Sequence, residues 1–191
     1  MGTAAVYGVS AVLPIPVLMG KTLYLLRHAK SSWEDPNLAD HDRPLAPRGR
    51  CASRTIADHL RRQRITPGLV LCSSSTRTRE TLERISAGLD EKFELQIEEA
   101  LYTASARDLL DRLHQVDARV DSVMLIGHAP AIQELALNLA SKGLQLERLR
   151  EKFSTGALAT LVFRGKWGEL APGAAELVAF VKPRELGRTP S

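Results

Sequence analysis

Four side chains suited to phosphate chemistry follow runs of residues that are typical of β-strands. Arg27 and His28 follow the first run, Arg77 follows the second across a serine-rich segment, and His128 follows the fourth. In an open α/β sheet these positions meet in the crevice outside the carboxyl ends of the strands. A guanidinium group pairs with two phosphate oxygens, and neutral imidazole is a competent nucleophile near pH 7. The sequence therefore predicts an anion pocket built for phosphoryl transfer.

Each of these residues also has an ordinary structural explanation. A single histidine after a strand is often a hydrogen-bonding group, and an arginine in the first turn of a helix is usually solvated. The segment Ser-Ser-Ser-Thr (73–76) is a common way to begin a helix. These explanations do not account for the convergence of all four, because like charges gathered without an anion repel one another.

The elements that must position these residues alternate between short β-rich runs and longer helical ones. Strands are predicted at 21–26, 68–73, 93–98, 122–127, 157–163 and 176–181, and helices at 45–63, 76–89, 105–116 and 129–140. This alternation predicts βαβ units. We expect a three-layer α/β/α fold with a mostly parallel central sheet and an antiparallel strand at an edge, formed by the last two strands.

The overall composition fits one ordinary domain. The chain has 191 residues, of which 44% are hydrophobic and 25% charged. Its net charge of +4 suits an anionic partner, although a solvated basic surface explains the charge equally well. Cys51 and Cys72 are too few for a disulfide scaffold, and we expect reduced thiols in a cytoplasmic protein.

The N-terminal segment 1–18 is apolar and carries no charge. It lacks the basic region of a secretory signal, Pro14 and Pro16 interrupt any helix, and it is too short to span a bilayer. We expect it to be a disordered extension or the product of an upstream start, with a cleaved leader as the alternative. Residues 19–191 are then a single domain with no membrane partner.

Other kinds of site lack their sequence signatures. The histidines do not have the spacing of a zinc site, and no phosphate-binding glycine loop or Gly-x-Ser-x-Gly elbow is present. No metal and no cofactor are therefore predicted. The basic stretch 59–64 lies on a predicted helix without interleaved aromatic residues, so we interpret it as a solvated face rather than a nucleic-acid site.

Four segments, in this order, together resemble the histidine phosphatase superfamily, and within it the SixA-type phosphohistidine phosphatases. They read LLRHAKSSW, DHDRPLAPRGR, CSSSTRTRETLE and LIGHAPAIQELA. The resemblance implies that His28 is the nucleophile and that Arg27, Arg77 and His128 complete the phosphate pocket. It also implies that Ser31 lines the substrate loop.

One feature departs from many members of that superfamily, which carry a glutamate general acid after a strand. Here Thr103 follows Leu101 and Tyr102 at the corresponding place. A phosphohistidine substrate has a better leaving group than an alkoxide and needs less help from an acid. Four residues of the loop after His28 remain candidate acids: Asp35, Asp40, His41 and Asp42.

The resemblance therefore implies a metal-independent phosphatase that forms a phosphohistidine intermediate. Its expected substrate is phosphohistidine on a signalling or phosphotransfer protein. A small phosphate ester as substrate, and a non-enzymatic phosphate-binding module, are the alternatives. The short chain leaves little room for a cap, so an open pocket is expected.

Two further interpretations concern arginines near this pocket. In the loop 40–50, Arg43 and Arg48 either pair with nearby aspartates or border the pocket mouth, and we favour the ion pairs. Arg79 lies two residues beyond Arg77, on another face of the predicted helix, and we interpret it as a surface or supporting residue.

Overall fold

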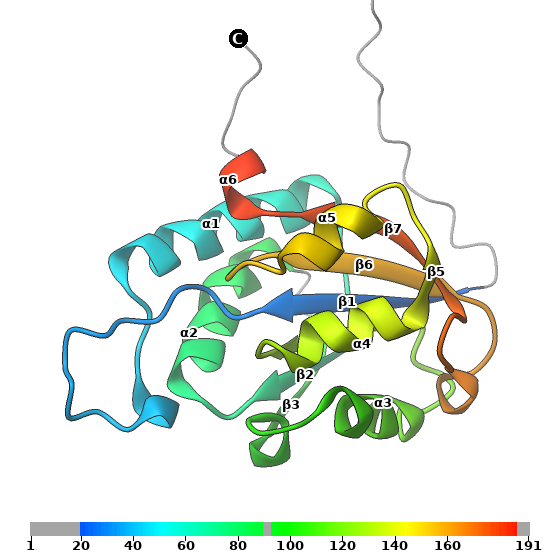
Figure 1. Cartoon of the computed structure of the whole chain (residues 1–191), viewed down its shortest axis with the longest axis horizontal. Coiled ribbons are helices and arrows are strands. Elements are labelled where there is room, and N and C mark those ends of the chain that lie inside the picture. Colours follow the sequence, from blue (N-terminus) through cyan, green and yellow to red (C-terminus); the bar gives the residue numbers. More distant parts are fainter. Residues whose placement is uncertain (1–19, 90–92, 187–191) are drawn as a thin grey trace, which may run out of the picture.

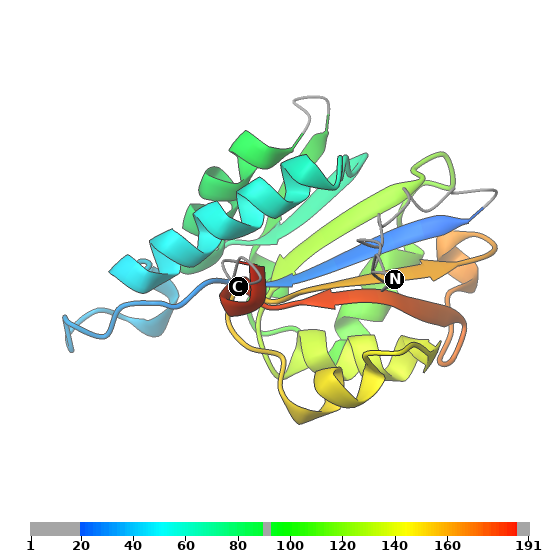
Figure 2. The ribbon, with the colours of Figure 1, turned by 90° about the horizontal axis from the view of Figure 1, so that it is seen from above.

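A seven-stranded sheet runs through the molecule with helices on both of its faces (Figures 1 and 2). The computed structural model describes residues 20–89 and 93–186, so the extension expected at 1–18 lies outside the described residues. The strand order is β3-β2-β4-β1-β6-β7-β5. The strands are β1 (Lys21–Arg27), β2 (Leu69–Ser73), β3 (Glu94–Glu98), β4 (Ser122–Gly127), β5 (Ala140–Lys142), β6 (Leu158–Phe163) and β7 (Ala175–Val181).

The strand pairings confirm the predicted mixed α/β sheet. β3, β2, β4 and β1 pair in parallel, whereas β6 runs antiparallel to both β1 and β7. The short β5, which was not predicted, pairs in parallel with β7. The predicted antiparallel pairing is thus found toward one edge of the sheet, and β5 adds one more strand outside it.

The first four helices form where the apolar periodicity predicts them, with small shifts at their ends, whereas the short α5 and α6 were not predicted. They are α1 (Pro47–Arg62), α2 (Thr76–Ile85), α3 (Ala106–His114), α4 (Ala131–Leu139), α5 (Leu146–Glu151) and α6 (Pro183–Leu186). Pro47 occupies the first turn of α1, and Ser105 with Asp108 forms a capping box at the start of α3. The helix predicted at 76–89 ends at Ile85, and a 3-10 turn continues it to Gly88.

The central strand β1 is buried on both faces, which fixes the position of its carboxyl end. Leu23 and Leu25 pack into the core shared with α3 and α4, whereas Leu26 packs into the core shared with α1 and α2. All three side chains are fully buried, and each contributes roughly 1.5–3 kcal/mol. The residues directly after β1 are therefore anchored on both sides of the sheet.

A glycine allows α1 to approach the segment that follows β1. The backbone N–H of Ala46 donates to the carbonyl oxygen of Lys30 at 2.8 Å. A Cβ atom at Gly49 would lie 2.2 Å from the same oxygen, well inside contact distance. The contact leaves room only for glycine at this position in the helix.

We expect Gly49→Ala to destabilise the fold even though alanine is the better helix former. The propensity gain is about 1 kcal/mol, whereas the backbone clash forces a shift that costs about 1–3 kcal/mol or more. Urea unfolding measures the net loss. The matched control is Gly68→Ala, because a Cβ there meets its nearest atom at an ordinary 3.5 Å. Equal stability of the two variants would contradict the proposed packing constraint.

Candidate active site

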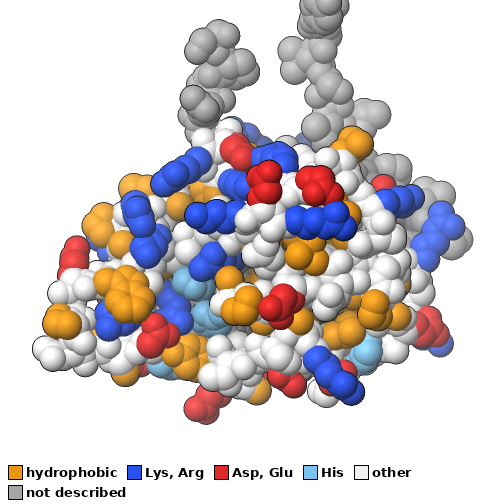
Figure 3. All heavy atoms as spheres, viewed as in Figure 1, with side chains coloured by type: hydrophobic (Ala, Val, Ile, Leu, Met, Phe, Trp, Pro, Cys, Tyr) orange, Lys and Arg blue, Asp and Glu red, His pale blue; other side chains and the backbone are white. Residues whose placement is uncertain are grey.

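The carboxyl ends of three neighbouring parallel strands bring the predicted site residues together. His28 follows β1, Arg77 lies in the first turn of α2 after β2, and His128 lies between β4 and α4. The ring centroids of His28 and His128 are 5.1 Å apart, and Nη2 of Arg77 is 3.5 Å from Nδ1 of His128. Figure 3 shows histidine side chains within a hollow of this face.

His28 is held as a neutral imidazole with a defined tautomer. Its Nδ1 is 2.7 Å from the carbonyl oxygen of Ala29, so Nδ1 carries the hydrogen and Nε2 keeps its lone pair. Burial, reinforced by the nearby His128, Arg77 and Arg27, lowers the pKa of His28 to about 3. The N–H of Ala29 donates to Oγ1 of Thr81 at 3.0 Å, which fixes the backbone beside the ring.

His128 is also neutral, but with the opposite tautomer. Its Nδ1 accepts from Arg77, so Nε2 carries the hydrogen and donates to Oγ of Ser73 at 2.8 Å. Burial, followed by the charge of Arg77, lowers the pKa of His128 to about 4. Ser73 was read from the sequence only as part of a helix start, and the structure gives it this second contact.

Arg77 is buried rather than solvated, and an aspartate holds it from the outer side. Its Nη2 donates to Oδ2 of Asp40 at 2.8 Å, and Nη1 donates to the Asp40 carbonyl oxygen. The Tyr102 hydroxyl donates to the same Oδ2 at 2.7 Å. This bond, together with Arg77, lowers the pKa of Asp40. Tyr102 was not predicted as a site residue, because only the fold brings it to Asp40.

Arg27 approaches the pair of histidines from the other side. Its Nη1 donates to the carbonyl oxygen of Phe153 at 2.7 Å. Its Nε is buried and has no hydrogen-bond partner among the described residues. The positive charge of Arg27 contributes to lowering the pKa of both His28 and His128. A bound anion would satisfy this unpaired, buried N–H donor beside the two neutral imidazoles.

Ser31 and Arg79 are placed apart from this group. Ser31 is buried and forms an isolated backbone bridge with Leu45. Within the described part of the chain, no hydrogen bond joins its hydroxyl to the four-residue group. Arg79 is exposed on α2.

The ion pairs predicted for Arg43 and Arg48 are wrong for the residues that the structure describes. Arg43 donates to the backbone carbonyl of Asp35, and its guanidinium carbon lies 4.2 Å from the ring centroid of Trp33. Arg48 is exposed on α1 and lines an open basin that also contains Arg27. Stacking on Trp33 and one backbone hydrogen bond hold Arg43 without a carboxylate, while its buried Nε has no hydrogen-bond partner among the described residues.

The candidate acids are not equivalent in the structure. The pKa of Asp40 is lowered, so its side chain is a carboxylate near neutral pH and has no proton to donate. His41 lies at the mouth, with Nε2 2.9 Å from Oγ of Ser74 and Nδ1 2.9 Å from Oδ1 of Asp42. Asp35 is exposed, and its Oδ1 accepts from the backbone N–H of Asn37 at 2.9 Å.

The described residues hold neither a metal-binding cluster nor a membrane-spanning helix. Residues 20–89 and 93–186 contain no group of three or more His, Cys, Asp or Glu side chains that could hold a metal ion. None of the helices in this part of the chain is long and apolar enough to cross a membrane.

Comparison with known proteins identifies the family. Residues 23–109 match the histidine phosphatase superfamily (branch 1). A structure from Nakamurella multipartitia, assigned as the phosphohistidine phosphatase SixA, is 30% identical, with a TM-score of 0.76 over 86% of this chain and 96% of the other. The chain belongs to the histidine phosphatase superfamily.

Other relatives of this histidine phosphatase superfamily member extend over most of its length. An uncharacterised protein of Mycobacterium tuberculosis is 38% identical over 83% of this chain and 100% of its own. The Agrobacterium tumefaciens structure, also assigned as SixA, is 29% identical, with a TM-score of 0.74 over 85% of this chain and 98% of its own. The family match and the two structures assigned as SixA support a phosphatase activity.

We expect nitrogen-15 NMR to show both site histidines neutral at pH 6, with hydrogen on Nδ1 of His28 and on Nε2 of His128. His28→Gln and His128→Gln assign the signals. Because unfolded histidine binds its proton near pH 6.5 whereas the folded rings do so at about 3 and about 4, stability should fall as pH is lowered from 6.5 toward 4. Titration of either folded ring near 6.5 would contradict the assigned environment.

Proposed function

We propose that this protein is a metal-independent phosphatase that removes phosphate from phosphohistidine on a signalling or phosphotransfer protein. The observation that carries the proposal is the free lone pair on Nε2 of His28, beside Arg27, Arg77 and His128. A neutral nucleophile surrounded by cationic donors suits attack on an anionic phosphoryl group.

The reaction has two steps. Nε2 of His28 forms a bond to phosphorus while the bond from phosphorus to the substrate nitrogen breaks. The substrate nitrogen keeps the electron pair, and the imidazole leaves neutral because its second nitrogen was protonated beforehand. Water then attacks the phosphorylated His28, inorganic phosphate leaves, and the lone pair returns to Nε2. Arg27 and Arg77 stabilise the equatorial oxygens in both steps.

The protonation state of the site favours a nitrogen leaving group. Asp40 is the candidate acid closest to Arg77, and its lowered pKa leaves it ionised. An alkoxide leaving group requires a strong acid, whereas an imidazole can be protonated on its second nitrogen before the P–N bond breaks. This difference supports phosphohistidine over a sugar phosphate or another simple ester.

The short connection between β2 and β3 supports a protein substrate. It is occupied by α2 and a 3-10 turn, and residues 90–92 are its only part outside the described chain. No large insertion is available there to close over the pocket, so a phosphorylated side chain on a protein surface has access. Ser31 is proposed to line the approach.

His28→Ala should abolish turnover of a phosphohistidine peptide and of p-nitrophenyl phosphate, because it removes the nucleophile that carries the covalent intermediate. In the parent protein, brief incubation with a radiolabelled phosphodonor should leave acid-labile, base-stable label. The matched control, His59→Ala, removes a histidine in the last turn of α1 and should retain that label. Full activity in His28→Ala would overturn the mechanism. Phosphate binding without turnover in the parent would instead indicate a binding module.

Arg77→Ala should lower kcat/KM by on the order of 10²-fold or more, since it removes a preorganised charge donor from the pocket. Arg79→Ala is the matched control, because Arg79 is exposed on the same helix and should lose little activity. Steady-state kinetics with p-nitrophenyl phosphate compares the two variants. Similar losses in both would indicate a general effect on α2 rather than a role for Arg77 at phosphorus.

A further inference from the structure

A strongly basic basin opens beside the four-residue site. Its volume is about 700 Å³, and Arg27 belongs to both the basin and the phosphate pocket. The other cationic side chains that line it are Lys30, Arg48, Lys152, Lys182 and Arg184. Glu185 is the one acidic residue of the lining, and its carboxylate is already paired with Arg148. The basin therefore has a large excess of positive charge that the phosphoryl chemistry does not use.

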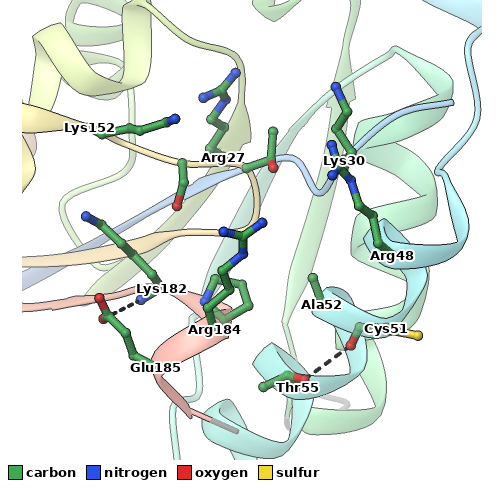
Figure 4. Close-up of a pocket in the computed structure, with 13 residues that line it drawn as sticks. Arg27, Lys30, Arg48, Cys51, Ala52, Thr55, Lys152, Lys182, Arg184 and Glu185 are labelled. Atoms are coloured by element: carbon green, nitrogen blue, oxygen red, sulfur yellow. Dashed lines mark hydrogen bonds between the residues drawn. The ribbon is translucent and has the colours of Figure 1, made fainter. Parts of the chain in front are cut away.

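These cations come from opposite walls of the basin (Figure 4). Lys30 follows β1 and Arg48 lies on α1, whereas Lys152 follows α5 and Lys182 follows β7. Arg184, on α6, lies between the two sides in the view of Figure 4. Four separate segments thus contribute positive charge to one opening, which makes a wide field rather than a single point of attachment.

The five cations beyond Arg27 have no charged partner in the described part of the chain, although Nζ of Lys182 lies over the Phe180 ring, 5.3 Å from its centroid. Among residues 20–89 and 93–186, none of them forms an ion pair, and none donates a side-chain hydrogen bond. Arg48, Lys152 and Arg184 are exposed to solvent. Such long, unrestrained side chains suit an extended acidic surface, because they adapt to distributed charges.

A small polyphosphorylated ligand fits this basin less well. Tight recognition of a compact polyanion requires donors that are already held in place, since ordering each long side chain costs about 0.5–1.5 kcal/mol. Of the residues that the structure describes, no aromatic one lines the basin, so a nucleobase would find no stacking surface among them. The pocket is also open, which leaves a protein surface able to reach both the phosphate pocket and the basin.

We propose that this basic basin docks the acidic surface surrounding the phosphohistidine of a protein substrate, so that substrates are selected by their negative charge next to the phosphorylated histidine. The inference rests on the proposed phosphatase function and names the chemistry of its partner. Arg27 connects the two sites: the phosphoryl group binds at one side of it and the acidic flank at the other.

The test compares two synthetic peptides, each phosphorylated on one central histidine. One peptide has flanking Asp and Glu residues, and the other has Ser and Asn. We expect the parent protein to prefer the acidic peptide by about tenfold in kcat/KM at low salt, and high salt should reduce this preference. The preference should disappear in the double variant Lys152→Glu, Arg184→Glu.

The matched control is Arg119→Glu with Arg164→Glu, which changes the net charge by the same amount. Arg119 precedes β4, and Arg164 follows β6, which runs antiparallel to β1. Both therefore lie at the end of the sheet opposite the carboxyl ends of its parallel strands. This control should keep the preference for the acidic peptide. A general effect of net charge would remove the preference in both double variants and would overturn the docking assignment.

Three further outcomes are decisive. Equal kcat/KM for the two peptides in the parent overturns the docking proposal while leaving the phosphatase function intact. Inhibition by sodium tripolyphosphate that is lost in the basin variant, together with equal turnover of the peptides, assigns the basin to a small polyanion instead. Failure of the parent to release phosphate from either peptide or from p-nitrophenyl phosphate overturns the proposed function itself, and the docking inference with it.

Discussion

The candidate site depends on keeping two imidazoles uncharged beside two guanidinium groups. Burial is the main cause of the low pKa of both His28 and His128, and the neighbouring arginines add to it. Protonation of either ring would place a third positive charge in a confined space, which is unfavourable until an anion enters. A bound phosphoryl group would therefore raise the pKa of His128 and allow its Nδ1 to gain a proton and donate to a phosphate oxygen. Binding and protonation are coupled by this charge balance.

The fold holds the backbone of the site rigidly, which keeps the two imidazoles and the two guanidinium groups in place. β1 is covered on both faces, so the backbone at Arg27 and His28 is held by two separate cores. The tautomer of His28 is set by a carbonyl oxygen one residue away, whereas that of His128 is set by Arg77 after β2, with Ser73 on that neighbouring strand accepting from Nε2. Sheet register thus controls which ring nitrogen carries the lone pair, and a small shift between β2 and β4 would alter it.

The sequence predicted the main strands and helices because their apolar periodicity reflects burial in the two cores. It could not predict β5, α5 or α6, which have three, six and four residues and are too short for a periodic signal. The four strand-end residues were found because the position after a parallel strand has a fixed place in the fold. Tyr102 was missed because its contact with Asp40 spans 62 residues and has no local signature. Arg43 was misread because sequence proximity to aspartates does not determine its contacts.

The site and the basin use positive charge in different ways, and the difference follows from solvent. Arg77 is buried, and Arg27 has a buried Nε, so their interactions with phosphate are weakly screened. The outer lysines and arginines of the basin face water, where each contact is weak and is reduced by salt. Many weak contacts favour association and selectivity without holding the product tightly. Chemistry can then remain in the buried pocket, where a few fixed donors act on phosphorus, while the exposed charges determine which phosphorylated surfaces arrive there.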